Sequence, residues 1–304
     1  MAGGVEIAVR PRGPYSLRLS LRLAGDATRV VRNGRLIARL DVDGRPQLAS
    51  AWQHLDGRVQ LRVPMAEAAD RLRFLLGLDD DHSEFIARFA SDPLLGRAVR
   101  HLKGLRPART ATVAQALLRA LCGQLIETKR ARALEARIVR AATPGQMEGG
   151  LHPAPTAADL ARFAPAELRR LGLHARRAAT LVRLCRSVDL ERLRSLPTAA
   201  AADRLERERG LGPWSVGVVC LEGLGRYERG LARDLGLIKL LSVLRGRWVK
   251  AEETDELLAP YGEWAGLASV YLLAGAARGL IPLPCGGLPI RSTARRLRLA
   301  QAAP

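Results

Sequence analysis

The spacing of apolar residues changes once along this chain, at the acidic run Asp79-Asp80-Asp81. Before this run, several short segments alternate apolar and polar residues, as half-buried strands do. After it, apolar residues recur every three or four positions, as on one face of an amphipathic helix. The change predicts an α+β fold, in which a small β-rich N-terminal part is followed by a mostly helical body.

Three N-terminal segments carry the strand signal. An apolar pair stands on either side of Asn33-Gly34, and this arrangement over residues 30–37 is the strongest short signal for a hairpin. Residues 15–23 alternate leucine with Ser or Arg, and residues 58–63 alternate again, so both are expected to be half-buried strands. A helix is expected over residues 66–76.

The rest of the chain is expected to be helical, with two exceptions. The stretch 143–155 is rich in Gly and Pro and predicts a loop, while residues 291–304 are expected to form a flexible basic tail. Helices are expected over residues 83–89, 93–103, 112–122, 157–163, 165–171, 175–187, 200–209, 213–223, 235–244, 251–258 and 267–278.

The charge of the chain indicates its partner. Lys and Arg number 49 against 30 Asp and Glu, which gives a formal net charge of +19 over 304 residues. Such an excess favours a polyanionic partner, and nucleic acid is the commonest. The alternative is a basic surface with no dedicated partner.

Several classes of site are disfavoured. The sequence has no paired Cys or His at metal-ligand spacing and no glycine-rich motif for a nucleotide, so no metal or cofactor is expected. No apolar run approaches a membrane span, and the N-terminal residues lack a signal-peptide pattern, so a cytoplasmic protein without membrane contact is expected. Four reduced, mostly buried thiols are then expected at Cys122, Cys185, Cys220 and Cys285.

The glycine pair in Gly210-Leu211-Gly212 lies between two predicted helices. Glycines permit a tight turn, and the first amides of the second helix are left without intrahelical partners. Such amides, together with the helix dipole, can bind a phosphate without reading sequence. This is the pattern of a helix-hairpin-helix motif, although a plain helix–helix turn explains a lone glycine pair equally well.

Asp234 stands at the start of a predicted helix, 22 residues beyond this turn. One interpretation is an ordinary N-cap, whose carboxylate accepts hydrogen bonds from first-turn amides. These bonds favour the charged form, so an N-cap aspartate is expected to be ionised at neutral pH. A catalytic carboxylate could therefore also serve as a cap.

Together, the glycine turn and Asp234 resemble the helix-hairpin-helix/Gly-Pro-Asp superfamily of DNA glycosylases, and within it the AlkA-like 3-methyladenine DNA glycosylase II family. Segments 120–126, 171–178 and 261–268 are similar to further family segments. The resemblance implies a TATA-binding-protein-like domain over residues 1–80 and an all-α glycosylase body. The body would comprise a helix-hairpin-helix subdomain (111–235) and a helical subdomain (81–110 with 236–290).

The resemblance also implies residue roles. Asp234 would be catalytic, stabilising positive charge on the sugar as the N-glycosidic bond breaks. The base must leave the stack to be reached, and Leu125 would fill the gap in the duplex. DNA contacts are expected at Gly210, Leu211, Gly212, Gln124 and Leu125, and a base pocket at Trp214, Val218, Leu235 and Trp264.

The implied activity is hydrolysis of alkylated bases, of the 3-methyladenine and 7-methylguanine type, from double-stranded DNA in base excision repair, by a monomer. Relatives that also cut the strand place a Schiff-base lysine where this chain has Trp214, so no lyase step is expected. Two alternatives remain open: a non-catalytic DNA-binding protein on the same scaffold, and a glycosylase for oxidised or deaminated bases.

Overall fold

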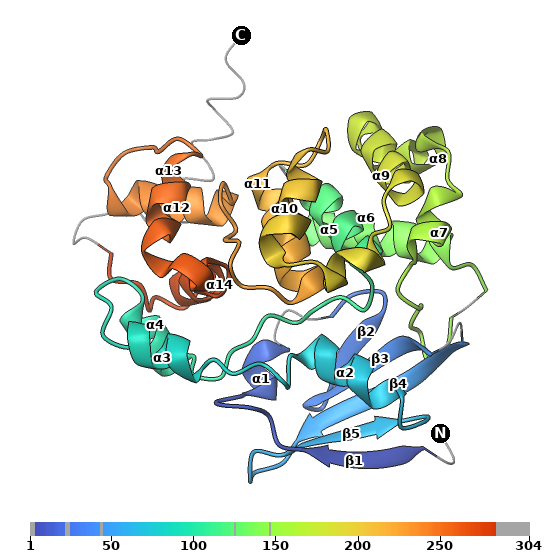
Figure 1. Ribbon diagram of the computed structural model, residues 1–304, viewed down its shortest axis with the longest axis horizontal. Coiled ribbons are helices and arrows are strands. Elements are labelled where there is room, and N and C mark those ends of the chain that lie inside the picture. The colour runs from blue at the N-terminus through green and yellow to red at the C-terminus, as the bar shows by residue number, and fades with distance from the viewer. Residues whose placement is uncertain (1–3, 22–24, 43–44, 125, 146, 284–304) are drawn as a thin grey trace.

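The computed structural model describes residues 4–21, 25–42, 45–124, 126–145 and 147–283. Its N-terminal part is a five-stranded antiparallel sheet with the order β1-β5-β4-β3-β2, and most of the helices lie to one side of it (Figure 1). The strands are β1 (Val5–Val9), β2 (Arg29–Arg32), β3 (Arg35–Val42), β4 (Arg45–Gln53) and β5 (Val59–Val63). The predicted division into a β-rich N-terminal part and a mostly helical remainder is confirmed.

The Asn33-Gly34 hairpin is confirmed as well. Strands β2 and β3 pair up to Arg32 and Arg35, which leaves a two-residue loop. Both loop residues have positive φ, 50° for Asn33 and 71° for Gly34. Only a turn with this handedness matches the right-handed twist of the flanking strands, and Asn-Gly adopts it at low cost. Strand β5 likewise confirms the strand expected over 58–63.

The strand expected over residues 15–23 is wrong. The structure has a one-turn helix there, α1 (Leu17–Ser20), capped by Ser16, whose Oγ accepts from the amide of Leu19. Leu17 and Leu21 are buried against the sheet, whereas Leu19 packs against the helical body. The alternating leucines therefore serve two apolar clusters on either side of a helical turn.

A first apolar cluster lies between the sheet and helix α2 (Ala68–Leu76). Strand β5 alternates buried and half-buried positions, and buried residues of β3, β4 and β5 form one face of the sheet that receives the buried stripe of α2. Helix α2 ends at Gly77, whose φ of 62° terminates it in the left-handed conformation. The sheet and α2 thus pack as two layers around one apolar cluster.

The helical body contains the following helices: α3 (Ser83–Phe89), α4 (Gly96–His101), α5 (Val113–Gly123), α6 (Thr128–Ala142), α7 (Ala157–Ala161), α8 (Pro165–Arg170), α9 (Ala175–Ser187), η1 (Glu191–Ser195), α10 (Thr198–Glu206), α11 (Pro213–Val218), η2 (Val219–Leu224), α12 (Leu235–Leu244), α13 (Glu253–Leu258), η3 (Ala259–Trp264) and α14 (Ala265–Ala276). Helix α6 was not predicted. The single helix expected over 213–223 becomes α11 followed by the π-helical turn η2. Helices α12 to α14 form one group and α5 to α11 another (Figure 1).

One apolar cluster runs through both groups of helices and also includes Ala27 of the N-terminal part, and α5 is buried along almost its whole length. The expected boundaries between a 111–235 subdomain and an 81–110 with 236–290 subdomain remain a prediction. The expected tail at 291–304 lies outside the described residues, as does Cys285. The three described cysteines, Cys122, Cys185 and Cys220, are buried and form no disulfide. Among the described helices, none has the length and apolar character needed to cross a membrane.

A buried network of charges joins the N-terminal part to the helical body. Arg119 of α5 contacts the carboxylates of Asp26 at 2.5 Å, Glu135 at 2.9 Å and Glu222 at 2.5 Å. Arg29 lies 3.3 Å from Asp26, and Arg132 3.1 Å from Glu135, so three cations face three anions. Burial alone raises the pKa of Asp26, yet Arg29 and Arg119 together hold it at about 2.

Candidate active site

Asp234 is the N-cap of helix α12, which begins one residue later. Its Oδ1 accepts hydrogen bonds from the backbone amides of Gly236 at 2.7 Å and Leu237 at 3.3 Å. Position 236 is a glycine because a Cβ there would lie 2.9 Å from Asp234 Oδ1 and 2.6 Å from Leu273 of α14. The helix start therefore holds one carboxylate oxygen in place.

Trp214 of α11 holds the other oxygen. Its indole Nε1 donates to Asp234 Oδ2 at 2.8 Å, which joins the helix after the glycine turn to the start of α12. The indole ring lies over Gly123 at the end of α5, where a Cβ would come within 2.6 Å of the ring carbon Cη2. Trp214 was predicted only as a wall of the base pocket, but its contact makes it a partner of the carboxylate.

The pKa of Asp234 is raised above its ordinary value, because burial disfavours the charged form. The amide of Gly236, the indole of Trp214, the amide of Leu237 and the charge of Lys239 all act in the opposite direction without cancelling the effect of burial. The sequence showed only the hydrogen bonds, which favour the charged form, and not the burial, which disfavours it. A carboxylate in this environment interacts strongly with a nearby positive charge, because little water screens it.

We expect Trp214→Phe to move the pKa of Asp234 further upward, because the variant removes a hydrogen bond that favours the ionised form. If the ionised carboxylate is the active form, the rate of base release rises with pH through this pKa. The acidic limb of the rate profile should therefore shift to higher pH in the variant, with much of the activity retained at alkaline pH. An unchanged profile, measured as single-turnover rate against pH, would contradict the role of the indole.

The glycine turn lies between α10 and α11, and the position of Gly210 explains its identity. Its φ is 96°, and a Cβ there would lie 2.5 Å from Thr180 Oγ1. Gly212 caps α11 without a side-chain hydrogen bond, and no heavy atom lies within 4 Å of where its Cβ would be. Gln124 braces the turn, since its Nε2 donates to the Gly210 carbonyl at 3.0 Å and to Ser215 Oγ at 2.9 Å. Leu211 is buried in the apolar cluster of the helical body.

The other predicted pocket residues lie in three different environments. Val218 is buried in the apolar core, whereas Leu235 is 48% exposed beside Asp234. Trp264 is half-buried and packs with His82, Phe85 and Tyr227. The structure thus brings Asp234, Trp214 and the glycine turn together, while Val218 packs inside. Leu125, the predicted wedge, lies outside the described residues.

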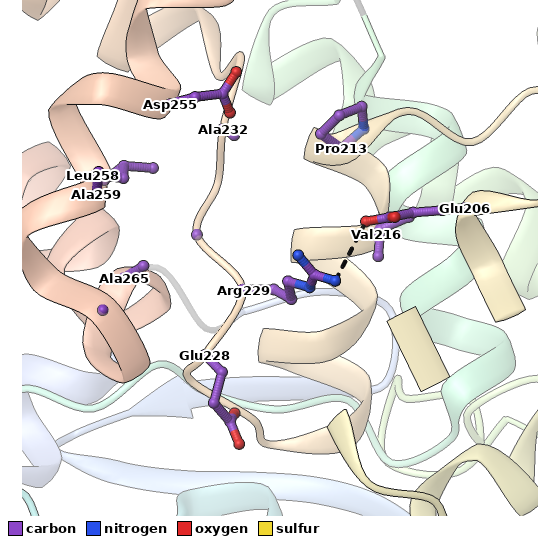
Figure 2. Close-up of a pocket in the computed structure, with 12 residues that line it drawn as sticks. Glu206, Pro213, Val216, Glu228, Arg229, Ala232, Asp255, Leu258, Ala259 and Ala265 are labelled. Atoms are coloured by element: carbon purple, nitrogen blue, oxygen red, sulfur yellow. Dashed lines mark ion pairs between the residues drawn. The ribbon is translucent and has the colours of Figure 1, made fainter. Parts of the chain in front are cut away.

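A cavity of about 220 Å³ lies beside this site, between α11 and the helices α13 and η3 (Figure 2). Pro213 and Val216 line one side, Leu258 and Ala259 the other, and segment 228–232 passes between them. All four predicted pocket residues are described, and none of them lines this cavity. In the described ranges no three His, Cys, Asp or Glu side chains are arranged to hold a metal ion.

The sequence did not single out two residues that contact the predicted pocket tryptophans Trp214 and Trp264. Gly123 makes room for the Trp214 ring, and Tyr227 stacks on Trp264 while its hydroxyl donates to Asp80 at 2.5 Å. Gly123 was visible only as part of a segment similar to the family. Tyr227 carried no signal, because its partners come from parts of the chain that only the fold brings together.

Comparison with known proteins identifies similar chains. No family model matches this chain. A DNA-3-methyladenine glycosylase of Bacillus subtilis is 25% identical over 252 residues, which cover 80% of this chain and 79% of the relative. A probable bifunctional transcriptional activator/DNA repair enzyme AlkA of Mycobacterium tuberculosis is 31% identical over 173 residues, which cover 56% of this chain and 35% of that relative.

Solved structures share the fold. A 3-methyladenine DNA-glycosylase from Archaeoglobus fulgidus matches with a TM-score of 0.77 at 21% identity, over 90% of this chain and 98% of that one. An 8-oxoguanine glycosylase/lyase of Clostridium acetobutylicum, in complex with double-stranded DNA, matches with a TM-score of 0.74 at 17% identity, over 92% and 100% of the two chains. The resemblance to AlkA-like DNA glycosylases drawn from the motifs is confirmed, and the chain has the fold of these structures.

Proposed function

We propose that this protein is a monofunctional DNA glycosylase, which hydrolyses the N-glycosidic bond of alkylated bases in double-stranded DNA. The observation that carries the proposal is the carboxylate of Asp234, half-buried beside the glycine turn and held by two backbone amides and the Trp214 indole. A helix needs only the amide bonds for its cap. The burial raises the pKa of the carboxylate, and a pKa shifted in this way is typical of a catalytic group.

The chemistry follows from where the charge develops. As the bond from the base to C1′ lengthens, the sugar acquires oxocarbenium character, which a fixed carboxylate nearby stabilises. A base methylated at a ring nitrogen already carries positive charge, so it leaves with the bonding electron pair and needs no strong general acid. Water then adds to C1′ and loses a proton, which leaves an abasic site and a free base.

The turn supplies the approach to DNA. The first amides of α11 have no side-chain cap, and the space around Gly212 is open, so a phosphate can reach the backbone there. Gln124 holds the turn through Gly210 and Ser215. We propose that Leu125, next in the chain, fills the gap left by the flipped nucleotide, and that Trp214 and Leu235 border the base.

Binding to duplex DNA should be sequence-independent and sensitive to salt, because a turn that contacts only phosphate and a net charge of +19 provide the affinity. Each phosphate contact should add about −0.9 to the slope of log K against log salt concentration. Fluorescence anisotropy with two unrelated undamaged duplexes measures this. A flat response to salt would remove the electrostatic argument.

The absence of a strand-cleaving step is proposed from Trp214, which stands where lyase relatives place a lysine. Lys239 is the lysine whose charge acts on Asp234, from the second turn of α12. Borohydride trapping tests this directly, because a Schiff base between any lysine and the opened sugar would be reduced to a stable cross-link. We expect no cross-link.

A panel of duplexes, each with a single lesion, separates the proposal from its alternatives. Release of 7-methylguanine and 3-methyladenine without 8-oxoguanine or uracil supports an alkylation-specific enzyme. Release of only the oxidised or deaminated base favours the second kind of glycosylase. If every duplex is bound and no base is released, the protein is a non-catalytic DNA-binding protein.

A further inference from the structure

Arg233, the residue before Asp234, has a left-handed backbone conformation, which is unfavourable for a residue with a Cβ atom. Arg233 has a φ of 65°, and apart from the hairpin residue Asn33 it is the only non-glycine with positive φ in the described part of the chain. The left-handed region costs an ordinary residue roughly tenfold in population relative to its usual conformations. Such strain persists only where surrounding contacts enforce it, and it gathers at functional sites.

Residues Leu231 to Asp234 form a four-residue turn, closed by a hydrogen bond from the Asp234 amide to the Leu231 carbonyl at 3.1 Å. Arg233 is the third residue, a position where a turn with positive φ usually has glycine. The turn sets the direction in which the chain enters α12. The aim of the Asp234 carboxylate at the amides of Gly236 and Leu237 therefore depends on this conformation.

Two fully buried hydroxyls clamp the turn. The Arg233 amide donates to Thr254 Oγ1 at 2.7 Å, and the Leu231 amide donates to Ser269 Oγ at 3.0 Å. Each hydroxyl donates its own proton to a carbonyl of its local helical segment, Thr254 to Ala251 and Ser269 to Ala265. Their lone pairs are therefore fixed as acceptors for the turn, and both residues are 0% exposed.

We propose that Thr254 is a positioning residue for Asp234, which acts by holding Arg233 in the left-handed conformation. The proposal rests on the catalytic role proposed for Asp234. The side chain of Arg233 contributes less, because its contacts to Glu252 at 3.7 Å and Asp255 at 3.9 Å are long and exposed to solvent. The essential group is the backbone amide, which only a side-chain acceptor at position 254 satisfies.

Thr254→Val has nearly the same shape but no acceptor. We expect it to lower the single-turnover rate of base release by about ten- to a hundredfold, since small displacements of a catalytic group have effects of this size. The affinity for undamaged duplex should be unchanged, and Thr254→Ser, which keeps the hydroxyl, should retain the rate. A Thr254→Val variant that is folded and as fast as the wild type would overturn the proposal.

A matched pair of second substitutions isolates the backbone effect. Glycine adopts positive φ without strain, so Arg233→Gly in the Thr254→Val background should restore most of the lost rate. Arg233→Ala removes the same charge but keeps a Cβ, and it should restore none. If both double variants recovered the rate equally, the effect would come from the Arg233 side chain and not from its backbone conformation, and the proposal would be overturned.

A readout without catalysis separates this inference from the proposed function. The indole N–H of Trp214 donates to Asp234, so its NMR resonance, assigned with Trp214→Phe, reports the position of the carboxylate. It should shift in Thr254→Val and return with Arg233→Gly but not with Arg233→Ala. If the wild type releases no base, the proposed function fails, and this pattern still decides the inference. If Thr254→Val does not fold, Arg233→Gly and Arg233→Ala are compared as single variants. Arg233→Gly should have a higher midpoint of thermal unfolding than Arg233→Ala. Equal midpoints would overturn the inference.

Discussion

Asp234→Asn should lower the rate of base release by about 10²–10³, which corresponds to the loss of about 3–4 kcal/mol of electrostatic stabilisation in the transition state. Asparagine caps helices about as well as aspartate, so α12 should still begin at the same residue. The folded protein should be no less stable at neutral pH. Burial raises the pKa of Asp234, so its ionised form opposes folding, and the neutral amide removes that penalty.

Two controls isolate the charge. The asparagine amide cannot accept hydrogen bonds on both sides, so Trp214 loses its acceptor; Trp214→Phe removes the same bond while keeping the charge, and it should cost less at alkaline pH. Asp92→Asn changes another carboxylate that accepts two backbone amides, far along the chain from Asp234, and it should leave base release unchanged. A folded Asp234→Asn protein with the full rate would reduce Asp234 to a cap.

Arg119→Met should destabilise the protein by about 3–5 kcal/mol, the usual result of removing one partner from a buried ion network. The change leaves Asp26, Glu135 and Glu222 without their shared cation. Arg132→Met is the matched control, because Arg132 is 30% exposed and contacts only Glu135 in this network. The control should cost clearly less than Arg119→Met, because the buried Glu135 keeps its contact with Arg119. Urea unfolding of the three proteins measures both values.

The same network predicts how stability depends on pH. The folded pKa of Asp26, about 2, lies below its unfolded value, and that of Glu222 is also lowered. Their contribution is therefore complete above the unfolded values near 4 and is lost as the pH falls toward 2. In Arg119→Met the positive charge that stabilises the ionised carboxylates is missing. The difference in free energy of unfolding between variant and wild type should therefore shrink on acidification. A difference that grows at low pH would contradict this account.

The parts of the fold that could be predicted depend on local chemistry. The Asn33-Gly34 turn requires positive φ at two residues, which its own sequence supplies, and α9 and α12 follow from apolar spacing and were predicted with their observed bounds. The prediction of a strand at Leu17–Ser20 was wrong because the leucines there pack into two different apolar clusters, and a local period cannot show this.

The site divides in the same way. The place of Asp234 at the start of a predicted helix predicted the cap at α12, which the structure confirms. The bond from Trp214, the burial that raises the pKa of Asp234, and the hydrogen bond from Arg233 to Thr254 could not be predicted. Each arises where α11, α12 and α13 meet, and their packing is a property of the folded chain.

The central claim is that this chain hydrolyses the bond between an alkylated base and its sugar, and that it leaves the strand intact. The most direct test is to incubate the protein with duplex DNA methylated by dimethyl sulfate, to chromatograph the free bases, and to measure strand breaks before and after alkali. The account predicts free 3-methyladenine and 7-methylguanine well above the uncatalysed level, with breaks only after alkali. No release above that level, or breaks that accompany release without alkali, would contradict it.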